Sequence, residues 1–388
     1  MRIGLIIFPF VPSHGSILQT YAIYMKLKEM GHSVTIINRV LPPTGIKIEL
    51  GRAFYSLINK IKGVYHGPIY YRGYAPKAIM KNLRPFINSN FGKDIVTIYR
   101  PEDTRTFVRL NKFDAFVVGS DQVWRPKFIP DIYHYYLDFL PVESKVKRIA
   151  FCPSFGTDEW EYSENQTNKC RTLISYFDYV AVRENSGVDF CRKYLNRQVI
   201  QLYDPTILYP APFYSALFNH SKNICKAITY NCDIASVYYL DYTESKKQIV
   251  DRVCSVLHIK ANYVNNKIQD YNAPLRDRIA PSIPLWIRGI ALSEFVITDS
   301  FHATLFALYY NKPFITVMNM RRGGARFTSL LGGLGLMERI VSSIEDVTEQ
   351  LIKKTIDWIS VNKSLDEQRG RSLSFLTNSL NVEDNFTL

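Results

Sequence analysis

The chain has 388 residues, of which 47% are hydrophobic and 21% are charged, an ordinary composition for a globular protein that can bury the cores of two domains. No apolar run approaches the roughly 20 residues that a helix needs to cross a bilayer. The net charge of +13 favours an anionic partner, which could be a phosphorylated small molecule, an anionic membrane surface or a nucleic acid.

The first forty residues predict a strand, a helix and a second strand. Arg2 to Phe8 is a short apolar run, as expected for a strand that is covered on both faces. This run superficially resembles a signal peptide, but it leads directly into a helical pattern from Ile17 to Met30, which favours a buried strand. Gly31 is suited to end the helix, and Ser33 to Val40 is the second strand. Such a βαβ unit predicts a parallel, doubly wound sheet.

A basic segment follows from Ile46 to Gly92, with eight Lys or Arg residues against one acid, Glu49, and with aromatic residues between them. It is interpreted as a solvated helical excursion, or as a surface that docks on lipid headgroups or on a lipid-linked substrate. Binding of nucleic acid stays open but has no recognised motif in its favour.

Four further strands are predicted before residue 205, and each ends in small or polar residues. The strands lie in FDAFVVGSDQVW, RIAFCPSFG, FDYVAVRENSG and VIQLYDPT. In open α/β sheets, ligands bind at the carboxyl ends of strands, although a simple loop role explains any one of these residues as well. The residues at the strand ends are Ser120, Asp121, Ser154, Arg183, Glu184 and Asp204.

The alternation of strands and helices predicts an α/β protein with two Rossmann-like domains that face a cleft. The first domain spans residues 1–204, and a loop-like region from Pro205 to Asn223 separates it from a second domain at residues 224–361. Residues 362–388 form a tail, helical from Leu365 to Leu380, that is expected to pack back on the first domain.

The six cysteines are scattered and lack the close pairs of a zinc site, so they indicate buried thiols in a reducing, cytoplasmic compartment. Phosphate-binding Gly-x-x-x-x-Gly-Lys loops, dinucleotide-binding Gly-x-Gly-x-x-Gly motifs and Gly-x-Ser-x-Gly nucleophile elbows are all absent from the sequence. No Asp-x-Asp pair occurs either. A mechanism that needs no metal and no cofactor is therefore favoured.

The segment TDSFHATLFALYY places Asp299, Ser300 and His302 between a buried strand and an apolar helix. The free amides and the dipole at the N-terminus of that helix would make an anion site. His302 could donate to a phosphate or a carboxylate, or act as a general acid or base near neutral pH. The alternative is that Asp299 or Ser300 only caps the helix and that His302 is packed without a chemical role.

Three other groups could bind an anion or a hydroxyl. Arg183 could bind a carboxylate or a phosphate through two parallel hydrogen bonds, or only form a surface ion pair. Asp121 could be a reactive carboxylate beside the flat side chain of Trp124, or a helix cap. The segment from Arg321 to Arg326 groups three arginines around two glycines, which favours a phosphorylated ligand over a solvated basic loop.

Taken together, these motifs resemble those of the polysaccharide pyruvyl transferase family. The resembling segments run in order through most of the chain, from Ile3 to Val341, and GSDQVW and TDSFHA are the most specific of them. The segments are HGSILQTYAI, FDAFVVGSDQVW, IAFCPSFG, VAVRENSG, YDPT, VITDSFHATLFALYYNKPF and RFTSLLGGLGL.

The resemblance implies a GT-B-like architecture and transfer of the enolpyruvyl group of phosphoenolpyruvate to two hydroxyls of a sugar, which forms a pyruvate ketal. Members that build capsular polysaccharide or exopolysaccharide often act on a saccharide carried by polyprenyl diphosphate at the inner face of the cytoplasmic membrane. The resemblance therefore implies a cytoplasmic protein with peripheral contact to that anionic surface and no nucleic-acid partner. The first domain would face the acceptor and the second would bind the donor.

The family's donor arginine corresponds to Arg183 and its histidine to His302. Many members have Arg-Leu-His where this chain has Ser300-Phe301-His302, so Ser300 would supply a hydrogen bond and Arg322 or Arg326 the missing charge. His302 is expected to be the general acid or a hydrogen-bond donor to the phosphate, and Asp121 the base on the acceptor hydroxyl. The expected donor-binding residues are Arg183, Ser300, Phe301, His302, Arg322 and Arg326, and the expected acceptor-binding residues are Ser16, Gln19, Ser120 and Trp124.

Two other functions stay open. A nucleotide-sugar glycosyltransferase of the GT-B type would need a site for a nucleoside diphosphate, which the basic turn up to Arg326 could provide. A protein without catalytic activity that binds a sugar or an anionic polymer would show salt-sensitive binding without turnover.

Overall fold

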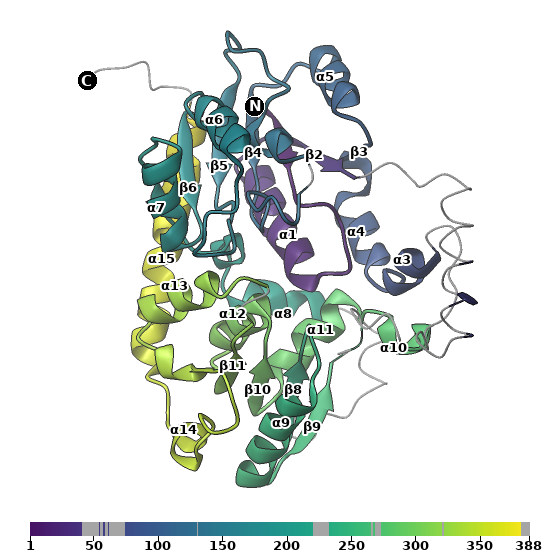
Figure 1. The fold of residues 1–388 in the computed structure, drawn as a ribbon, viewed down its shortest axis with the longest axis vertical. Helices are drawn as coiled ribbons and strands as arrows, with labels where there is room; N and C mark the ends of the chain where they lie inside the picture. Colours follow the sequence, from purple (N-terminus) through teal and green to yellow (C-terminus); the bar gives the residue numbers. More distant parts are fainter. Residues whose placement is uncertain are drawn as a thin grey trace.

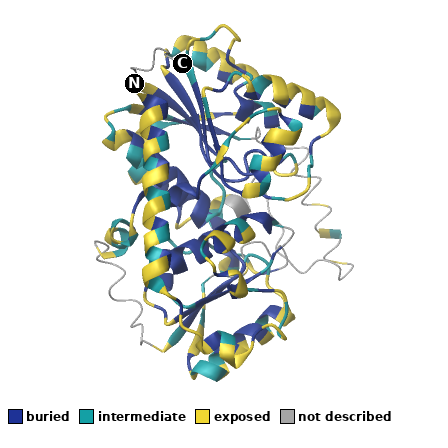
Figure 2. Ribbon diagram, turned by 90° about the vertical axis from the view of Figure 1, so that its left-hand side faces the viewer, coloured by how far each residue is buried: buried dark blue, intermediate teal, exposed yellow. Residues whose placement is uncertain are grey.

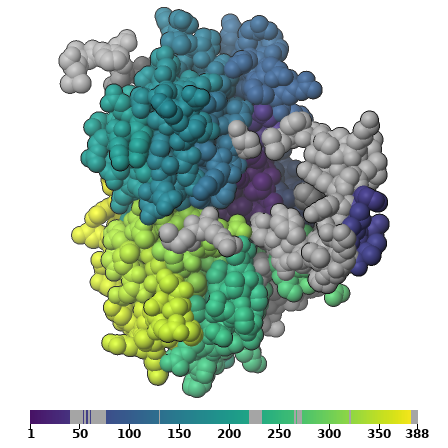
Figure 3. All heavy atoms as spheres, viewed as in Figure 1, coloured from purple at the N-terminus to yellow at the C-terminus, as the bar shows by residue number. Residues whose placement is uncertain are grey.

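The computed structural model describes residues 1–40, 54, 57–58, 61, 74–129, 131–219, 233–264, 267, 273–319 and 322–381. Two parallel sheets form the two halves of the molecule, which meet across its middle (Figures 1 and 3). Most of the basic segment predicted as a docking surface, from residue 46 to residue 73, lies outside the described residues, and so does Arg321.

The first sheet, as far as the described residues show, has seven strands in the order β3-β2-β1-β4-β5-β6-β7. Ile3, Leu5 and Ile6 of the central strand β1 have no exposed surface, because helices cover both faces of the sheet (Figure 2). The strands are β1 (Arg2–Ile6), β2 (Ser33–Arg39), β3 (Ile95–Ile98), β4 (Ala115–Val118), β5 (Lys147–Phe151), β6 (Tyr179–Val182) and β7 (Ile200–Gln201). The helices of this half are α1 (His14–Glu29), α3 (Tyr74–Ile79), α4 (Arg84–Phe91), η1 (Gly92–Asp94), α5 (Pro101–Leu110), η2 (Ile132–Tyr136), α6 (Glu164–Ile174) and α7 (Asn185–Tyr194).

The second sheet has five described strands in the order β12-β11-β10-β8-β9. All of their pairings are parallel, as in the first sheet. The strands are β8 (Ile234–Tyr238), β9 (Lys260–Tyr263), β10 (Phe295–Thr298), β11 (Phe314–Val317) and β12 (Ile340–Val341). The helices are α9 (Glu244–Leu257), α10 (Leu275–Arg278), α11 (Ile283–Ala291), α12 (Phe301–Tyr309), α13 (Ala325–Gly333), η5 (Met337–Arg339) and α14 (Glu349–Lys353).

The region from Pro205 to Asn223, predicted as a loop, is largely helical where it is described. It contains η3 (Pro205–Leu208) and α8 (Ala211–Asn219), and α8 packs against α11. Pro210 precedes α8 and Pro212 lies in its first turn, where proline is well tolerated. The loop prediction was therefore wrong for this segment.

The last helix, α15 (Trp358–Leu380), runs along one side of the molecule past both sheets (Figure 1). Its Phe375 ring lies 5.9 Å from the ring of Phe151 in β5 and 6.2 Å from that of Tyr179 in β6. Arg369 donates a hydrogen bond to the carbonyl of Ile207 at 2.8 Å. The chain thus leaves the second sheet and ends against the first.

Each sheet has one point at which the strand order reverses. In the first sheet, β1 pairs with β2 on one side and β4 on the other; in the second, β8 pairs with β9 on one side and β10 on the other. Such a reversal leaves a crevice at the carboxyl ends of the strands, where open α/β sheets bind ligands. Within the described parts of the chain, no helix combines the length and the apolar character that crossing a bilayer requires.

Candidate active site

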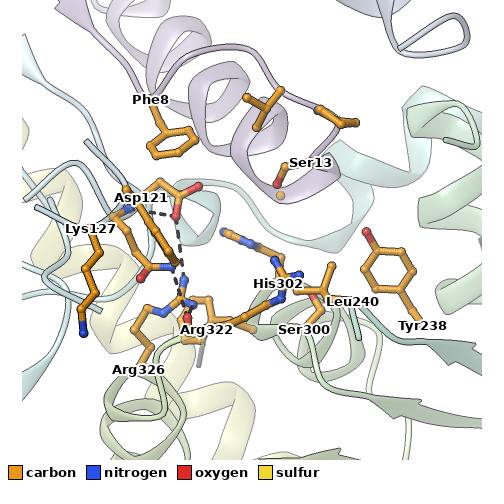
Figure 4. Close-up of a pocket in the computed structure, with 16 residues that line it drawn as sticks. Phe8, Ser13, Asp121, Lys127, Tyr238, Leu240, Ser300, His302, Arg322 and Arg326 are labelled. Atoms are coloured by element: carbon orange, nitrogen blue, oxygen red, sulfur yellow. Dashed lines mark hydrogen bonds and ion pairs between the residues drawn. The ribbon is translucent and has the colours of Figure 1, made fainter. Parts of the chain in front are cut away.

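A cavity of about 400 Å³ lies between the two domains, where the reversal points of both sheets face each other (Figure 4). Its wall includes one residue from the loop after each of the four strands at those points. These residues are Phe8 after β1, Asp121 after β4, Leu240 after β8 and Ser300 after β10. The cavity is therefore built from the parts of the fold that most often hold ligands.

Two helices from different domains begin at this cavity. α1 begins after Ser13, whose hydroxyl accepts a hydrogen bond from the Ser16 N–H at 3.3 Å. α12 begins after Ser300, whose hydroxyl accepts one from the Ala303 N–H at 3.5 Å. Both capping serines line the cavity. Because the free N–H groups and the dipole at a helix N-terminus attract negative charge, the cavity is suited to an anion.

His302, in the first turn of α12, is held from behind by side chains of the first domain. Its Nε2 lies 3.3 Å from Oδ2 of Asp204 and contacts the amide nitrogen of Gln19 in α1. The Gln19 amide also donates a hydrogen bond to the same Asp204 oxygen at 2.6 Å. All three residues are buried. The other ring nitrogen, Nδ1, is hydrogen-bonded to no residue that the structure describes, so it is the one left for a ligand.

Besides His302 and Gln19, Arg183 and Thr206 also donate hydrogen bonds to Asp204. Arg183 donates to its Oδ2 at 2.7 Å, and Thr206 donates its N–H and its hydroxyl to Oδ1 at 3.0 and 2.8 Å. Burial would raise the pKa of the Asp204 carboxyl, but the charge and hydrogen bond of His302, together with Arg183 and Thr206, hold it well below its ordinary value. Asp204 is therefore a carboxylate that fixes the orientation of the His302 ring.

Two buried arginines share the carboxylate of Asp121. Oδ1 of Asp121 lies 3.5 Å from Nη2 of Arg183 and 3.8 Å from Nη1 of Arg326. Both guanidinium groups also face the ring of Phe301, at 5.0 and 5.3 Å from its centroid. Nε of each arginine is buried and has no hydrogen-bond partner among the described residues. Of the two, Arg326 lines the cavity, so its Nε is the donor that remains for the oxygens of a ligand.

The two described arginines of the basic turn differ in how far they are neutralised. Arg322 donates to both carboxylate oxygens of Asp241 at 2.7 Å, and this pairing lowers the pKa of Asp241 to about 2. Arg326 lines the same cavity and donates to the backbone carbonyl of Arg322, and the one carboxylate within ion-pair distance of it among the described residues is the more distant, shared Asp121. Burial, and then the charge of Arg183, lower the pKa of Arg326 to about 10, which leaves it a cation at neutral pH. Arg326 is thus the better placed of the two to meet an anion.

Asp121 has a backbone conformation that is rare for a residue with a side chain. Its φ is +74°, in the left-handed region. A bridge to Pro153 and a hydrogen bond of 2.8 Å from the Ser154 N–H to its carbonyl hold it there. Backbone strain that neighbouring strands maintain in this way is typical of functional residues, and here it directs a carboxylate at the cavity (Figure 4).

Asp299 does not line the cavity. Its carboxylate accepts hydrogen bonds from the N–H groups of Leu240 at 2.6 Å and Asp241 at 3.1 Å, and it forms an ion pair of 2.5 Å with Lys246. Asp299 therefore holds the loop that brings Leu240 to the cavity wall. No cluster of three potential metal ligands occurs among the residues that the structure describes.

The chain matches the family model for polysaccharide pyruvyl transferase over residues 14–319, which is most of its length. The chain belongs to the polysaccharide pyruvyl transferase family. No curated protein is similar to it in sequence.

Solved structures share the fold of this pyruvyl transferase family member at low sequence identity. The UDP-GlcNAc 2-epimerase of Neisseria meningitidis aligns with a TM-score of 0.53 and 10% identity, over 98% of this chain and 99% of the epimerase. The UDP-N-acetylglucosamine 2-epimerase of Rickettsia bellii aligns with a TM-score of 0.50 and 9% identity, over 97% of this chain and 96% of the other. At such identities the likeness concerns the fold alone. It agrees with the two parallel sheets, and the predicted GT-B-like architecture of two Rossmann-like domains is confirmed.

The structure brings most of the predicted pyruvyl transferase residues together. Arg183, predicted to bind the donor directly, lies behind the cavity wall with 2% of its surface exposed. It contacts the carboxylates of Asp204 and Asp121 instead, because burial at the end of β6 leaves it only these partners at ion-pair distance among the described residues. The predicted residues that line the cavity are Asp121, Ser300, Phe301, His302, Arg322 and Arg326.

The predicted acceptor residues do not line the cavity. Trp124 is fully buried and stacks on Tyr136 at 4.7 Å, so it is part of the core and not a wall for a sugar. The hydroxyl of Ser120 donates to a backbone carbonyl at 2.7 Å, and Ser16 is buried within α1. Gln19 holds His302. These placements do not support the acceptor set, because a position at a strand end does not tell which way a side chain points.

Two important residues were given no role from the sequence. Asp204 stood out only as a strand-end residue, and its contact with His302 arises from the packing of two domains. Gly15 lies so close to His302 that a Cβ atom there would be 2.0 Å from the Cγ of the imidazole. Both residues lie in segments that resemble the family, HGSILQTYAI and YDPT, and that resemblance was the signal that could have identified them.

His14, the residue before Gly15, fastens the start of α1 to the second domain. Its Nε2–H donates to the carbonyl of Pro281 at 2.9 Å, and the Tyr238 hydroxyl lies 3.3 Å from its Nδ1. Its ring stacks on Trp286 with 5.2 Å between the centroids. Burial lowers the pKa of His14 to about 4, against the opposing effect of the bond to Pro281. His14 is thus a neutral imidazole in the folded protein at pH 7.

The substitution His14→Gln should flatten the pH dependence of stability between about pH 6.5 and pH 4. In the native protein the folded state keeps this imidazole neutral while the unfolded state binds a proton, so the free energy of unfolding falls as the pH decreases, by roughly 3 kcal/mol over the window. Urea unfolding at several pH values measures the slope. The exposed His258 at the end of α9 provides the control, His258→Asn. An unchanged slope in His14→Gln would contradict the neutral imidazole.

Proposed function

We propose that this protein transfers the enolpyruvyl group of phosphoenolpyruvate onto two hydroxyls of one sugar, which forms a pyruvate ketal during synthesis of a capsular polysaccharide or exopolysaccharide. The observation that carries the proposal is the cavity in which two helix N-termini meet Arg326 and a His302 backed by Asp204. Phosphoenolpyruvate carries a phosphate and a carboxylate on three carbons, and these donors suit both charges.

The proposed reaction takes up one proton and releases two from the sugar. The C=C electron pair of phosphoenolpyruvate takes a proton at the methylene carbon, which leaves an oxocarbenium-like centre at the carbon that bears the phosphate oxygen. One sugar hydroxyl attacks this carbon and loses its proton. Inorganic phosphate then leaves with the electrons of its C–O bond, and the second hydroxyl closes the ketal as it loses its proton.

We assign the chemical roles from the positions of the side chains. His302, held through Nε2, is the general acid that protonates the donor, and Asp121 is the base for the acceptor hydroxyl. Arg326 and the N-terminus of α12 bind the donor anions, so Arg326 supplies the charge that many relatives place at the position of Ser300. Arg183 positions Asp204 and Asp121 from behind. This scheme uses no metal and no cofactor.

The acceptor in this proposal is a saccharide carried by polyprenyl diphosphate at the cytoplasmic face of a membrane. The net charge of +13 would draw the protein to an anionic leaflet as a peripheral protein. Nucleic acid has no part in the scheme.

Phosphoenolpyruvate should stabilise the protein against thermal unfolding, whereas uridine and guanosine diphosphates should not. At about 100 times its dissociation constant, a ligand adds roughly 2.7 kcal/mol to the free energy of unfolding, which a melting curve resolves readily. Arg326→Met should weaken the binding of phosphoenolpyruvate at least tenfold, because it removes the buried cation that faces the donor.

The exposed Arg192 on α7 pairs with Asp189 of the same helix and lies outside the cavity wall. It provides the matched control in Arg192→Met, which should bind phosphoenolpyruvate as the native protein does. Stabilisation by a nucleoside diphosphate alone would replace the proposal with glycosyl transfer from a nucleotide sugar. If none of the three ligands raises the melting temperature, the result would favour a protein that binds sugar or an anionic polymer without turnover.

A further inference from the structure

The cavity has a basic side and a side that is rich in apolar residues. Arg322, Arg326 and His302 come from the second domain, which also contributes Leu240 and Phe301. Two loops of the first domain contribute four further apolar residues, together with Lys127. In Figure 4, Phe8 lies across the cavity from Arg322 and Arg326. The apolar residues of the first domain are Phe8, Val11, Pro12 and Phe128. The methylene group of phosphoenolpyruvate is its only apolar part, so the donor leaves these four side chains unused.

The loop that carries Phe8 is restrained at several points. It contains Pro9 and Pro12, which limit the backbone on both sides of Phe10. The N–H of Phe10 donates to the side chain of Asn38 at 3.2 Å, and the Phe10 ring stacks on Phe91 at 5.7 Å. Phe8 itself packs partly against the core of the first domain. Its ring is therefore held in place before a ligand arrives.

Phe128 is held by a buried ion pair. The guanidinium of Arg125 lies 4.7 Å from the centroid of the Phe128 ring, and it donates to both carboxylate oxygens of Glu161 at 3.1 and 3.0 Å. Phe128 keeps 40% of its surface exposed although it is a large apolar residue. A fixed aromatic ring with an exposed surface at a cavity wall is a feature of binding sites more than of cores.

We infer that Phe8 and Phe128 form an aromatic shelf that binds a pyranose ring of the acceptor through its C–H face. This inference rests on the proposed function and adds where the acceptor lies. A pyranose presents C–H groups on a face and hydroxyls around its edge, so a ring on the shelf directs its hydroxyls towards Asp121, which lies between Phe8 and Arg326 in Figure 4. Recognition by the shelf concerns a neutral sugar ring and does not require the diphosphate of a lipid carrier.

The shelf can be tested by ligand-observed NMR with methyl glycosides of glucose, galactose and mannose as probes. At least one should bind the native protein, and Phe8→Leu should weaken that binding about tenfold, because leucine keeps the apolar bulk but loses the flat ring. Phe128→Leu should have a similar effect. Phe107→Leu is the matched control. Phe107 lies in α5, is also partly buried and packs against the ring of Phe113, but it does not line the cavity. Thermal stabilisation by phosphoenolpyruvate should be unchanged in all three variants.

The outcomes separate the shelf from the transfer reaction. Glycoside binding that depends on Phe8 and Phe128 supports the shelf even if phosphoenolpyruvate neither binds nor turns over, which would overturn only the proposed function. Turnover of phosphoenolpyruvate with an unchanged acceptor KM in both variants would overturn the shelf and leave the function standing. A native protein that binds none of the three glycosides would also overturn the shelf.

Discussion

Replacing Gly15 with alanine is expected to lower turnover by about 100-fold while leaving the protein folded. The added methyl group would lie 2.0 Å from both Cγ and Nδ1 of His302, closer than any real contact, so the imidazole has to move. A displacement of the acid by about 1 Å is enough for a loss of this size. In an open helix the same change would stabilise the protein, by about 1 kcal/mol.

Gly370 in α15 provides the matched control, because no atom lies within 4 Å of a Cβ built there. Gly370→Ala should gain about 1 kcal/mol of stability and keep full turnover. Melting curves and kcat for both variants make the comparison. A Gly15→Ala protein that is folded and fully active would show that His302 is not held where the structure places it, or that it is not the acid.

The substitution Asp204→Asn should reduce turnover by roughly 10²- to 10⁴-fold and destabilise the protein by about 3 kcal/mol. Asparagine keeps the shape of the side chain but removes the charge that compensates the buried Arg183 and orients His302. The native carboxyl has a lowered pKa, so its contribution to stability is complete above the ordinary value of 3.8 and is lost as the pH falls towards the folded-state value. That acid-sensitive part should disappear from the pH dependence of unfolding in Asp204→Asn.

A double-mutant cycle separates a role through His302 from a loss of structure. If Asp204 acts through His302, then Asp204→Asn should cost little further turnover once His302→Ala has removed the acid. The loss of stability, in contrast, should appear in either background because Arg183 loses the closer of its two carboxylate partners and keeps only the more distant Asp121 among the described residues. Fully additive losses of turnover would mean that Asp204 works independently of His302.

The alternation of strands and helices could be predicted because buried parallel strands are short apolar runs. The runs at Arg2 to Phe8 and Ser33 to Val40 became β1 and β2 with nearly the expected bounds. The segment that became α8 was predicted as a loop. Its helical conformation depends on packing against α11, which the sequence of the segment does not indicate. The hydrophobic pattern predicted secondary structure correctly for these buried strands. It failed for α8, whose conformation depends on a helix far away in the sequence.

The candidate site shows the same division. Asp121 and His302 could be identified because each follows a strand in an exposed-looking polar turn. The pairing of His302 with Asp204, the approach of Gly15 and the exposed ring of Phe128 all depend on how loops from two sheets meet. The sequence indicates which residues lie at strand ends. Which of their side chains point into the cavity can be seen only in the folded structure.

The pairing of His302 with Asp204 and Gln19 crosses the boundary between the domains, since the histidine belongs to one and its partners to the other. Neither domain alone therefore contains both the histidine and the side chains that orient it. The arrangement forms only where the two domains are in contact. Under the proposed function, the proton donor is complete only while the two domains are in contact, because their separation would remove Asp204 and Gln19 from His302.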